Sequence, residues 1–556
     1  MDNFIVKVDN LNDSTVIFSK QIAKIYQIQN LKTSIFRFGF KSAEVEVSVS
    51  EELNSHEILI SSNIIKKLKL PLSVNYNVVI VNNEIVFGPF IGISMGRTVD
   101  RLYRGLGILN GFLKHYNRIN GVIFGFTTDQ VDKNNLEIKG LMYNPQKDIW
   151  EKTILPYPST IFKRKEIGQE WREYFSSLYP GKIFNYKHFD KWDAHDRLVQ
   201  FPKIAEILPD TTLYSDENDI VRYLDLHKDI YVKPLKGNGG HGIFNIKRLD
   251  NGTIKIETLE NGESLQWNFK EDREFKDFIN DKLITGKYII QQTLDFKVGN
   301  KTLDFRIGLD KDQSGNWKNN MFVTRISGDH SIVSNVASSG GTVSYPFDAL
   351  KNIYQMDDTE AKEYEEKLIS TGLKIAKRID QSGIPLGKLA LDIAIDRNKK
   401  MWLIEVNNKS PNDGLLRPLG DKDMQYEIRY TNMLYAKKLA GFDIQSNENV
   451  FSFHQDDGSE ADETVRYHLY VSVRGKRKSY RRYVRDVSKS YDVVGKIKRI
   501  VNRVVEIEIE GQKSVVHKFI SEIKNDEYAD RIKGMAVKEI PVQNNEQKMV
   551  LLKGKK

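Results

Sequence analysis

Three residues in the middle of the chain have the types and spacing of a magnesium site. Asp392 lies within the apolar segment Ala390–Ala394, and Glu405 and Asn407 lie within Leu403–Asn407. On a strand, residues two apart face the same way, so Glu405 and Asn407 project together. A carboxylate among apolar neighbours is costly to bury without a counter-charge, and magnesium with substrate phosphates supplies one. The alternative interpretation is that Asp392 and Glu405 simply pair with lysines.

Four basic residues precede this set at intervals along the chain. Arg197, Lys233, Arg306 and Arg325 each lie on or beside a predicted helix or strand rather than in an evident solvated run. Transfer of a phosphoryl group requires cations around the oxygens on which charge develops. We therefore interpret Lys233, Arg306 and Arg325 as candidates for catalysis by phosphoryl transfer.

A glycine loop follows Lys233. The stretch Tyr231–Phe244 contains a β-prone segment, four glycines and a second apolar segment that can return as the paired strand. Glycine lets backbone N–H groups approach an anion closely and tolerates positive φ, so the pattern suits a flexible phosphate cover. Neither a P-loop nor a dinucleotide fingerprint is present, because no Gly-Lys-Ser/Thr and no helix follows. An ordinary hairpin turn is the alternative.

The elements that must position these residues follow from the periodicity of apolar residues. Residues 1–95 alternate as short strands, and residues 88–162 read as an α/β unit with a parallel sheet and one helix from Leu102 to His115. In the central region we expect a helix from Trp192 to Leu208, a helix at 358–379, and strands at 288–294, 302–308, 320–326, 389–395 and 401–407.

Composition limits the classes of protein. A chain of 556 residues suggests three or four domains, and 40% hydrophobic with 29% charged residues is typical of a soluble globular protein. The sequence contains no apolar run long enough to span a membrane and no secretory pattern at its start, so we expect a cytoplasmic protein. Zero cysteines leave oxygen or imidazole ligands for any metal, which favours magnesium.

The C-terminal region is basic. From Arg466 onward there are 23 Lys and Arg against 11 Asp and Glu, behind an acidic linker at 456–463. Its elements are predicted in the order βαββαβ, an α+β sandwich. We expect either a soluble surface or an anionic partner here, and disfavour nucleic acid because aromatic stacking residues are few.

Residues 190–420 resemble the ATP-grasp enzymes of the glutathione synthetase-like branch. The resemblance implies ATP and magnesium as cofactors, with Asp392, Glu405 and Asn407 as metal ligands and Arg306 near the phosphates. The remaining nucleotide-binding residues that it implies are Arg197 in place of a lysine, Lys233, Lys236, Gly237, Gly239, Gly240 and the adenine hinge Gln291, Gln292, Thr293 and Leu294. The substrate-binding residues that it implies are Arg325, Asn335, Gly340 and Gly341.

Two further resemblances cover most of the chain. Gly88–Ile93, Tyr157–Thr160 and Phe189–Trp192 are similar to YheC/YheD-type endospore coat-associated ATP-grasp proteins, which implies a spore-forming bacillus and possible spore association. Residues 465–542 resemble acylphosphatase, with Arg481 as the phosphate-binding arginine. Arg499 stands where that family has a water-positioning asparagine, so we expect this domain to bind an anion without hydrolysis.

Together these resemblances imply a carboxylate–amine ligase that acts through an acyl phosphate, with a carboxylate and an amine, small molecule or peptide, as substrates. The alternatives are a structural spore-coat protein with vestigial nucleotide binding and a kinase-like phosphotransferase. The expected domains are β-rich (1–95), pre-ATP-grasp α/β (96–190), ATP-grasp (191–450), acidic linker (451–464), acylphosphatase-like ferredoxin sandwich (465–545) and basic tail (546–556).

Overall fold

The computed structural model divides into two compact units, which we describe separately. The central unit is Asn185–Ile428, and the split unit combines Met1–Phe184 with Arg429–Lys556. The residues described are 3–10, 13–237, 242–260, 263–298, 301–327, 341–409, 411, 413–442, 449–453, 463–474, 477–500, 504–525 and 531–552. No described helix is long and apolar enough to cross a membrane.

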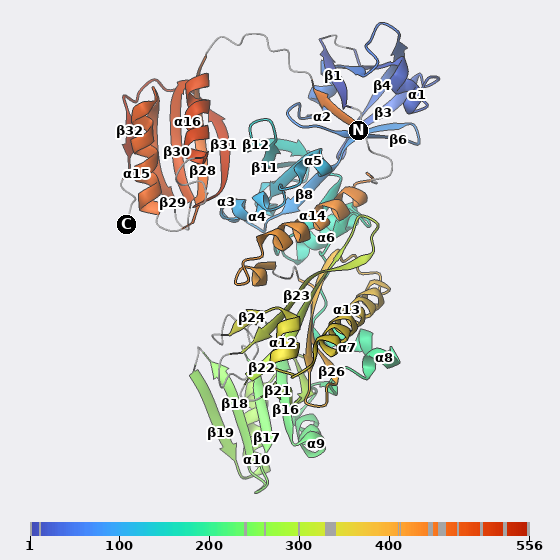
Figure 1. The fold of residues 1–556 in the computed structure, drawn as a ribbon, viewed down its shortest axis with the longest axis vertical. Coiled ribbons are helices and arrows are strands. Elements are labelled where there is room, and N and C mark those ends of the chain that lie inside the picture. The colour runs from blue at the N-terminus through green and yellow to red at the C-terminus, as the bar shows by residue number, and fades with distance from the viewer. Residues whose placement is uncertain are drawn as a thin grey trace. The chain divides into compact units, whose positions relative to one another are not determined.

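An eight-stranded sheet opens the split unit (Figure 1). Its strands, in spatial order, are β27 (Val450–Phe453), β1 (Asn3–Asp9), β5 (Glu57–Ser61), β2 (Thr15–Ser19), β4 (Lys41–Ser50), β3 (Thr33–Phe38), β7 (Glu84–Gly88) and β6 (Asn77–Val81). Alternation on β4 buries Val45 and Val47 and exposes Glu44 and Glu46, as the period of two predicts. Helices α1 (Lys20–Ile25) and α2 (Ser62–Leu68) complete this part.

A second sheet of the split unit has parallel strands at one end. These are β14 (Ile183–Phe184), β13 (Thr160–Lys163), β8 (Phe90–Ser94) and β9 (Val122–Phe126), followed by antiparallel β11 (Glu137–Asn144) and β12 (Ile149–Pro156). The predicted α/β unit is therefore confirmed. The single helix that we expected from Leu102 to His115 is wrong, because the segment forms α3 (Val99–Arg104), α4 (Leu106–Asn110) and α5 (Tyr116–Ile119). Glycines separate them, and a Cβ at Gly111 would lie 1.6 Å from the Arg429 guanidinium.

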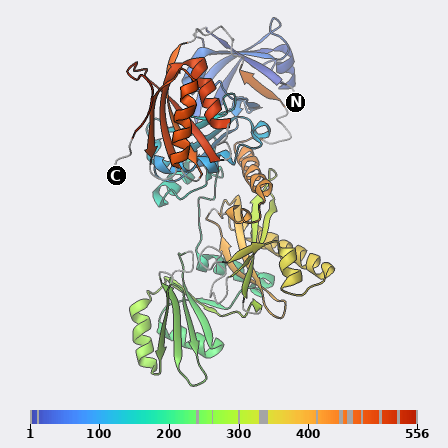
Figure 2. The same ribbon diagram turned by 60° about the vertical axis from the view of Figure 1, so that its left-hand side comes forward.

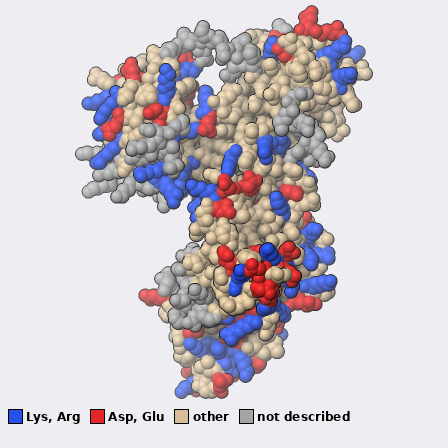
Figure 3. All heavy atoms as spheres, in the orientation of Figure 1, with Lys and Arg blue, Asp and Glu red and all other residues tan. Residues whose placement is uncertain are grey.

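The same sheet continues into the C-terminal region, because β12 pairs in parallel with β31 (Ile532–Ile540). Its remaining strands follow in the order β28 (Thr464–Val473), β30 (Val504–Gln512), β29 (Val494–Ile500) and β32 (Met549–Leu551). Helices α15 (Arg477–Val487) and α16 (Lys513–Asn525) lie on one face of these strands in Figure 1. The chain order βαββαβ matches the prediction. Figure 3 shows many Lys and Arg side chains over this region, with Asp and Glu between them.

The central unit contains two separate sheets of mainly antiparallel strands, which form distinct layers in Figures 1 and 2. The first has the order β15 (Thr211–Leu213), β20 (Tyr288–Gln292), β16 (Asp229–Pro234), β17 (Phe244–Arg248), β18 (Ile254–Glu260) and β19 (Glu263–Phe269). The second has the order β24 (Thr342–Ser344), β23 (Trp317–Ile326), β22 (Lys301–Lys311), β25 (Lys388–Ile395) and β26 (Met401–Asn407), with β21 (Lys297–Val298) beside β22.

Helices cover both sheets of the central unit. Helix α13 (Asp358–Asp380) packs its apolar stripe into the core of the second sheet, and α9 (Glu217–His227) and α10 (Asp272–Lys282) cover the first. The helix expected from Trp192 to Leu208 is interrupted. It forms α7 (Lys191–Val199) and α8 (Pro202–Ala205), because Pro202 has no N–H to continue the first helix and instead starts the second.

Candidate active site

The two carboxylates and the amide singled out by the sequence lie on neighbouring strands. In the β25–β26 ladder Asp392 is paired with Glu405, and Asn407 is paired with Ala390. Residues that oppose each other in an antiparallel pair share a face of the sheet, so the three side chains lie on one face. Asn407 Nδ2 donates to Asp392 Oδ2 at 3.2 Å. Asp392 is buried, whereas Glu405 is partly exposed.

Two arginines from adjacent strands hold Asp392. Arg306 lies opposite Asp392 in the β22–β25 ladder and donates to both carboxylate oxygens, from Nη2 to Oδ2 at 2.8 Å and from Nε to Oδ1. Arg325 Nη2 is 2.9 Å from Asp392 Oδ2, and Arg325 also binds Asp304 through two hydrogen bonds of 2.6 and 2.7 Å. These contacts form a chain of alternating charges across three strands.

The pKa values follow from this arrangement. Burial alone would raise the pKa of Asp392, but Arg306 and Arg325 outweigh it and hold that pKa below its ordinary value. Burial would lower the pKa of Arg325, yet Asp392 and Asp304 raise it overall. Asp392 and Arg325 are therefore charged at neutral pH.

Lys233 approaches the same place from the first sheet. Its Nζ donates to Gln291 Oε1 at 2.6 Å, and Gln291 in turn donates to Thr211 Oγ1 at 3.0 Å. Burial lowers the pKa of Lys233 to about 8, although the charge of Glu405 opposes the shift. Glu405 of β26 is therefore within electrostatic reach of Lys233 of β16.

Lys191, at the start of α7, completes the group. Its Nζ lies 3.9 Å from Glu405 Oε1 and donates to Pro234 O at 3.2 Å, at the base of the glycine loop. Asp190 caps α7 and fixes this position, because its side chain accepts from the N–H groups of Trp192 and Asp193.

We name this group the Asp392 cluster. It consists of three carboxylates and four cations: Asp304, Asp392, Glu405, Lys191, Lys233, Arg306 and Arg325. Burial and the charge of Asp392 raise the pKa of Glu405, and the nearby cations offset this only in part. The cluster thus holds a carboxylate, Glu405, with a raised pKa and an ion pair to Lys191 that spans 3.9 Å, among four positive groups.

The comparisons with known proteins agree with this geometry. Residues 181–439 match the family model described as YheC/D like ATP-grasp. Residues 181–439 form an ATP-grasp domain of the YheC/D type. Residues 469–550 match the acylphosphatase family, so the second resemblance is also confirmed. The ATP-grasp fold with a C-terminal acylphosphatase-like domain is the fold class expected from the sequence.

Relatives and solved structures are similar over large parts of the chain. The endospore coat-associated protein YheD of Bacillus subtilis (strain 168) is 25% identical over 420 residues, which cover 73% of this chain and 89% of YheD. YheC of the same organism is 24% identical over 309 residues, which cover 52% of this chain and 81% of YheC. A RiPP-associated ATP-grasp ligase of Chryseobacterium gregarium, solved with ADP and a leader and core peptide, is 12% identical with a TM-score of 0.34, covering 65% of this chain and 99% of that one.

Several expected nucleotide-binding residues of the ATP-grasp domain lie away from the Asp392 cluster or outside the described residues. Arg197 lies on α7 with a buried Nε that has no hydrogen-bond partner, and no ion pair among the described residues joins it to the cluster. Lys236 and Gly237 are described, with no such contact either. Gly239 and Gly240 lie outside the described residues, as do Asn335 and Gly340; Gly341 precedes β24.

Two backbone N–H groups of the expected adenine hinge already donate to carbonyl oxygens within the fold. The N–H of Gln292 donates to Asp210 O at 3.0 Å and that of Thr293 to Asp229 O at 3.1 Å. For the N–H of Leu294 we find no acceptor among the described residues. A base at this hinge would therefore depend on Leu294 rather than on its two predecessors.

Two residues of the cluster were not assigned from the sequence. Asp304 lies two residues before Arg306 on β22, so the strand period places it on the same face, and this signal was available. Lys191 lies within Phe189–Trp192, a stretch noted only for its family resemblance. Its approach to Glu405 depends on how α7 packs, which no local pattern indicates. The expectation that lysines neutralise both carboxylates is wrong for Asp392, which pairs with arginines.

The donor set of the cluster fits magnesium. Among the described residues, Asp392 Oδ1 accepts a hydrogen bond from Arg306 alone and Asn407 donates its side-chain N–H to Asp392, which leaves the Asn407 carbonyl oxygen able to bind a cation. Glu405, with its raised pKa, adds a third oxygen. Hard oxygen ligands of this kind suit a magnesium ion that shares its other positions with phosphate and water.

In the acylphosphatase-like domain, Arg481 contacts the backbone. Its Nη2 donates to Ile497 O at 3.3 Å and to Leu552 O at 2.5 Å. The loop residues 475–476 and the side chains of Arg477, Lys478 and Arg499 lie outside the described residues. Arg481 thus uses guanidinium N–H groups to bind backbone carbonyls. Its role in binding an anion stays a prediction.

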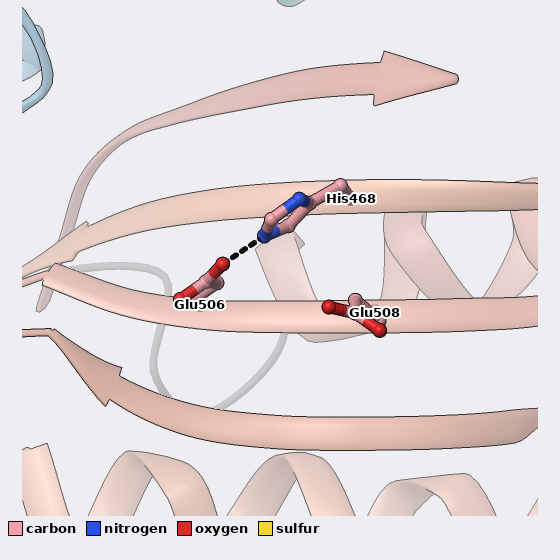
Figure 4. A group of neighbouring side chains, drawn as sticks. All are labelled: His468, Glu506 and Glu508. Carbon is pink, nitrogen blue, oxygen red and sulfur yellow. Dashed lines mark ion pairs between the residues drawn. The ribbon is translucent and has the colours of Figure 1, made fainter. Parts of the chain in front are cut away.

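A second charged group lies on the sheet of that domain. Its centre is Arg466, fully buried, which pairs with Glu508 at 2.9 Å, Glu510 at 2.9 Å and Glu546 at 2.6 Å. We name these residues, with Lys496 and Lys498, the Arg466 network. Beside it, His468 pairs with Glu506, and the ligand atoms of His468, Glu506 and Glu508 lie within 4.8 Å of one another (Figure 4). Because Glu508 is already bound by Arg466 and Lys498, we interpret this trio as part of the ion-pair network.

Proposed function

We propose that this chain is an ATP-dependent ligase that joins a carboxylate to an amine. The observation that supports the proposal best is that Lys233 of one sheet lies within electrostatic reach of Glu405 of the other, where Glu405 is paired with Asp392, the partner of Arg306. The ATP-grasp family model covers the same residues, which favours nucleotide chemistry at this place.

The cations divide into two groups by position. Lys191 and Lys233 lie at the base of the glycine loop and are placed to bind the phosphates of ATP. Arg306 and Arg325 lie deeper in the second sheet, where their charges are fixed by Asp392 and Asp304. Preorganised charges of this kind stabilise a transition state without reorganisation during the reaction.

The proposed reaction has two steps. The substrate carboxylate oxygen attacks the γ-phosphorus of ATP, the bond to the β-γ bridging oxygen breaks, and ADP leaves with that electron pair. The amine nitrogen then attacks the acyl carbon of the acyl phosphate, inorganic phosphate leaves, and the nitrogen loses a proton. Magnesium, held by Glu405, Asn407 and Asp392, would neutralise charge on the phosphates. Exclusion of water protects the acyl phosphate, which hydrolyses readily.

An ADP-release screen with amino acids, short peptides and acidic polymers tests the proposal. We expect release that requires both a carboxylate and an amine, together with a condensation product in the mass spectrum. Glu405→Gln should lower it by about 10²–10³, whereas Glu360→Gln, which removes an exposed ion pair with Lys399 at the start of α13, should not. Release with a carboxylate alone would instead favour the kinase-like phosphotransferase.

A structural role in the spore coat is the second candidate. It is favoured by the names of the relatives YheD and YheC, both described as endospore coat-associated. The wild-type protein would then bind ATP without releasing ADP with any substrate pair, and it would fractionate with spore coats. Substrate-dependent turnover by the same preparation would contradict a purely structural role.

A further inference from the structure

A cleft in the split unit lies apart from the Asp392 cluster. Its volume is about 820 Å³, and it is walled by the loop that follows α2 (residues 69–73), by β11 and β12, and by the first two turns of α16. It therefore joins the N-terminal sheet, the α/β part and the acylphosphatase-like domain. None of the groups assigned above to ATP or magnesium lines it.

The walls of the cleft are cationic. Lys69, Lys147 and Lys513 line it, together with His517 and one carboxylate, Glu151. Lys69 is bound at 2.6 Å by Glu137, which lies outside the lining. Lys147 lies 3.5 Å from Glu151, and Lys513 lies 3.6 Å from a residue outside the lining, Glu463. Both pairs are partly exposed, and such pairs contribute only about 0–1 kcal/mol each. Carboxylates of a ligand can therefore replace these partners at little cost.

The edge of a strand also opens on the cleft. Strand β12 pairs with β11 along its whole length, but with β31 only at Trp150 and Glu151. Over residues 152–156 no strand among the described residues pairs on the β31 side. Ile154, one of four β12 residues that line the cleft, keeps 47% of its surface exposed. An unpaired strand edge beside an exposed apolar side chain is a template for an added strand.

We propose that this cleft binds an acidic peptide segment of another protein, in extended conformation, as an additional strand on β12. The lysines would bind its carboxylates, and the backbone of residues 152–156 would bind its main chain. The absence of Phe, Tyr and Trp from the lining disfavours single-stranded nucleic acid, which such sites bind largely by stacking on aromatic rings. The cleft is also far larger than a single phosphate or sulfate requires.

Fluorescence anisotropy on the full-length protein tests the proposal. The probe is a fluorescein-labelled eight-residue peptide of alternating Glu and Thr. We expect saturable binding that the double variant Lys147→Glu/Lys513→Glu weakens at least tenfold. Lys518→Glu, exposed on α16 and outside the lining, is the matched control and should bind as the wild type does. A peptide with Pro in place of each Thr keeps the charge but loses main-chain donors, and should also bind at least tenfold more weakly.

Ile154→Asp keeps the test decisive if the double variant does not fold. This exposed substitution places a negative charge at the strand edge and should weaken the Glu-Thr peptide similarly. Equal binding of the Pro-containing peptide would overturn the strand-addition proposal, since charge alone would then suffice. Tighter binding of a ten-nucleotide uridine RNA would assign the cleft to nucleic acid. If the Glu-Thr peptide binds only after the acidic residues of 456–462 are replaced by Asn and Gln, the chain's own linker occupies the cleft. That result would also overturn the proposal of a segment from another protein.

Discussion

The Asp392 cluster and the Arg466 network are both arginine–carboxylate groups on a β-sheet, but one carboxylate of the first has its pKa shifted in the opposite direction to all those of the second. Hydrogen bonds from Arg466 and Lys496 lower the pKa of Glu546 to about 2, and the pKa values of Glu508 and Glu510 are also below their ordinary value. In the Asp392 cluster the pKa of Glu405 is raised. Carboxylates whose pKa values are lowered by their cations stabilise the folded state, whereas a carboxylate with a raised pKa among several cations is typical of a ligand site.

Removal of the central arginine should give the largest effect. Arg466→Met leaves three carboxylates close together without their shared cation, and we expect a loss of about 3–5 kcal/mol in the free energy of unfolding. Urea denaturation measures this change. ADP release per folded molecule should stay near the wild-type value. A loss of turnover without a loss of stability would contradict the purely structural role of the Arg466 network.

The matching change in the other group should affect turnover instead. Glu405→Gln removes a proposed magnesium ligand, and we expect turnover to fall by about 10²–10³, the range found when one preorganised charge or donor is lost. The free energy of unfolding should stay constant or rise, since a carboxylate beside Asp392 has been neutralised. Steady-state ADP release and urea denaturation of the same preparation check both parts. Near-normal turnover would contradict the assigned role.

The dependence of stability on pH should separate the groups further. Glu546, with a folded pKa of about 2 against 4.5 when unfolded, contributes stability above pH 4.5 that is lost as the pH falls towards 2. Glu405 has a raised folded pKa, so the folded state takes up its proton first and gains stability as the pH falls from neutrality towards 4.5. Unfolding free energies from pH 2 to 7 should therefore show a weaker acid loss, by about 2–3 kcal/mol, in Glu546→Gln. In Glu405→Gln the profile between pH 4.5 and 7 should flatten; unchanged profiles would refute both assignments.

The smallest expected effect concerns single lysines. Lys191→Met should weaken ATP binding by about tenfold, or ~1.4 kcal/mol, because one cation at the base of the glycine loop is lost. Lys498→Met, which removes a partner of Glu508 in the other network, should leave ATP binding unchanged. Isothermal titration with a non-hydrolysable ATP analogue measures the affinity of both variants. Equal losses of affinity in Lys191→Met and Lys498→Met would contradict a specific role of Lys191 in binding ATP.

Much of this was predictable from local patterns. The period of two placed Glu405 and Asn407 on one face, and the cations Lys233, Arg306 and Arg325 were found from their positions in predicted strands. Other features depend on long-range packing. The binding of Arg306 to Asp392 depends on the register of β22 against β25, residues 86 apart in sequence, which alternation alone does not specify. The position of Lys191 depends on the packing of α7, and the separation of α7 from α8 depends on Pro202, whose effect was overlooked.

The pairing of β1 with β27 has a consequence for biosynthesis. Asn3 lies opposite Val450, so β1 lacks one neighbour until the ribosome has synthesised the residues up to β27. The central unit is continuous in sequence and can fold during that interval, which lasts tens of seconds at about 5–20 residues per second. The central unit can therefore fold before β27 is available to cover the edge of β1.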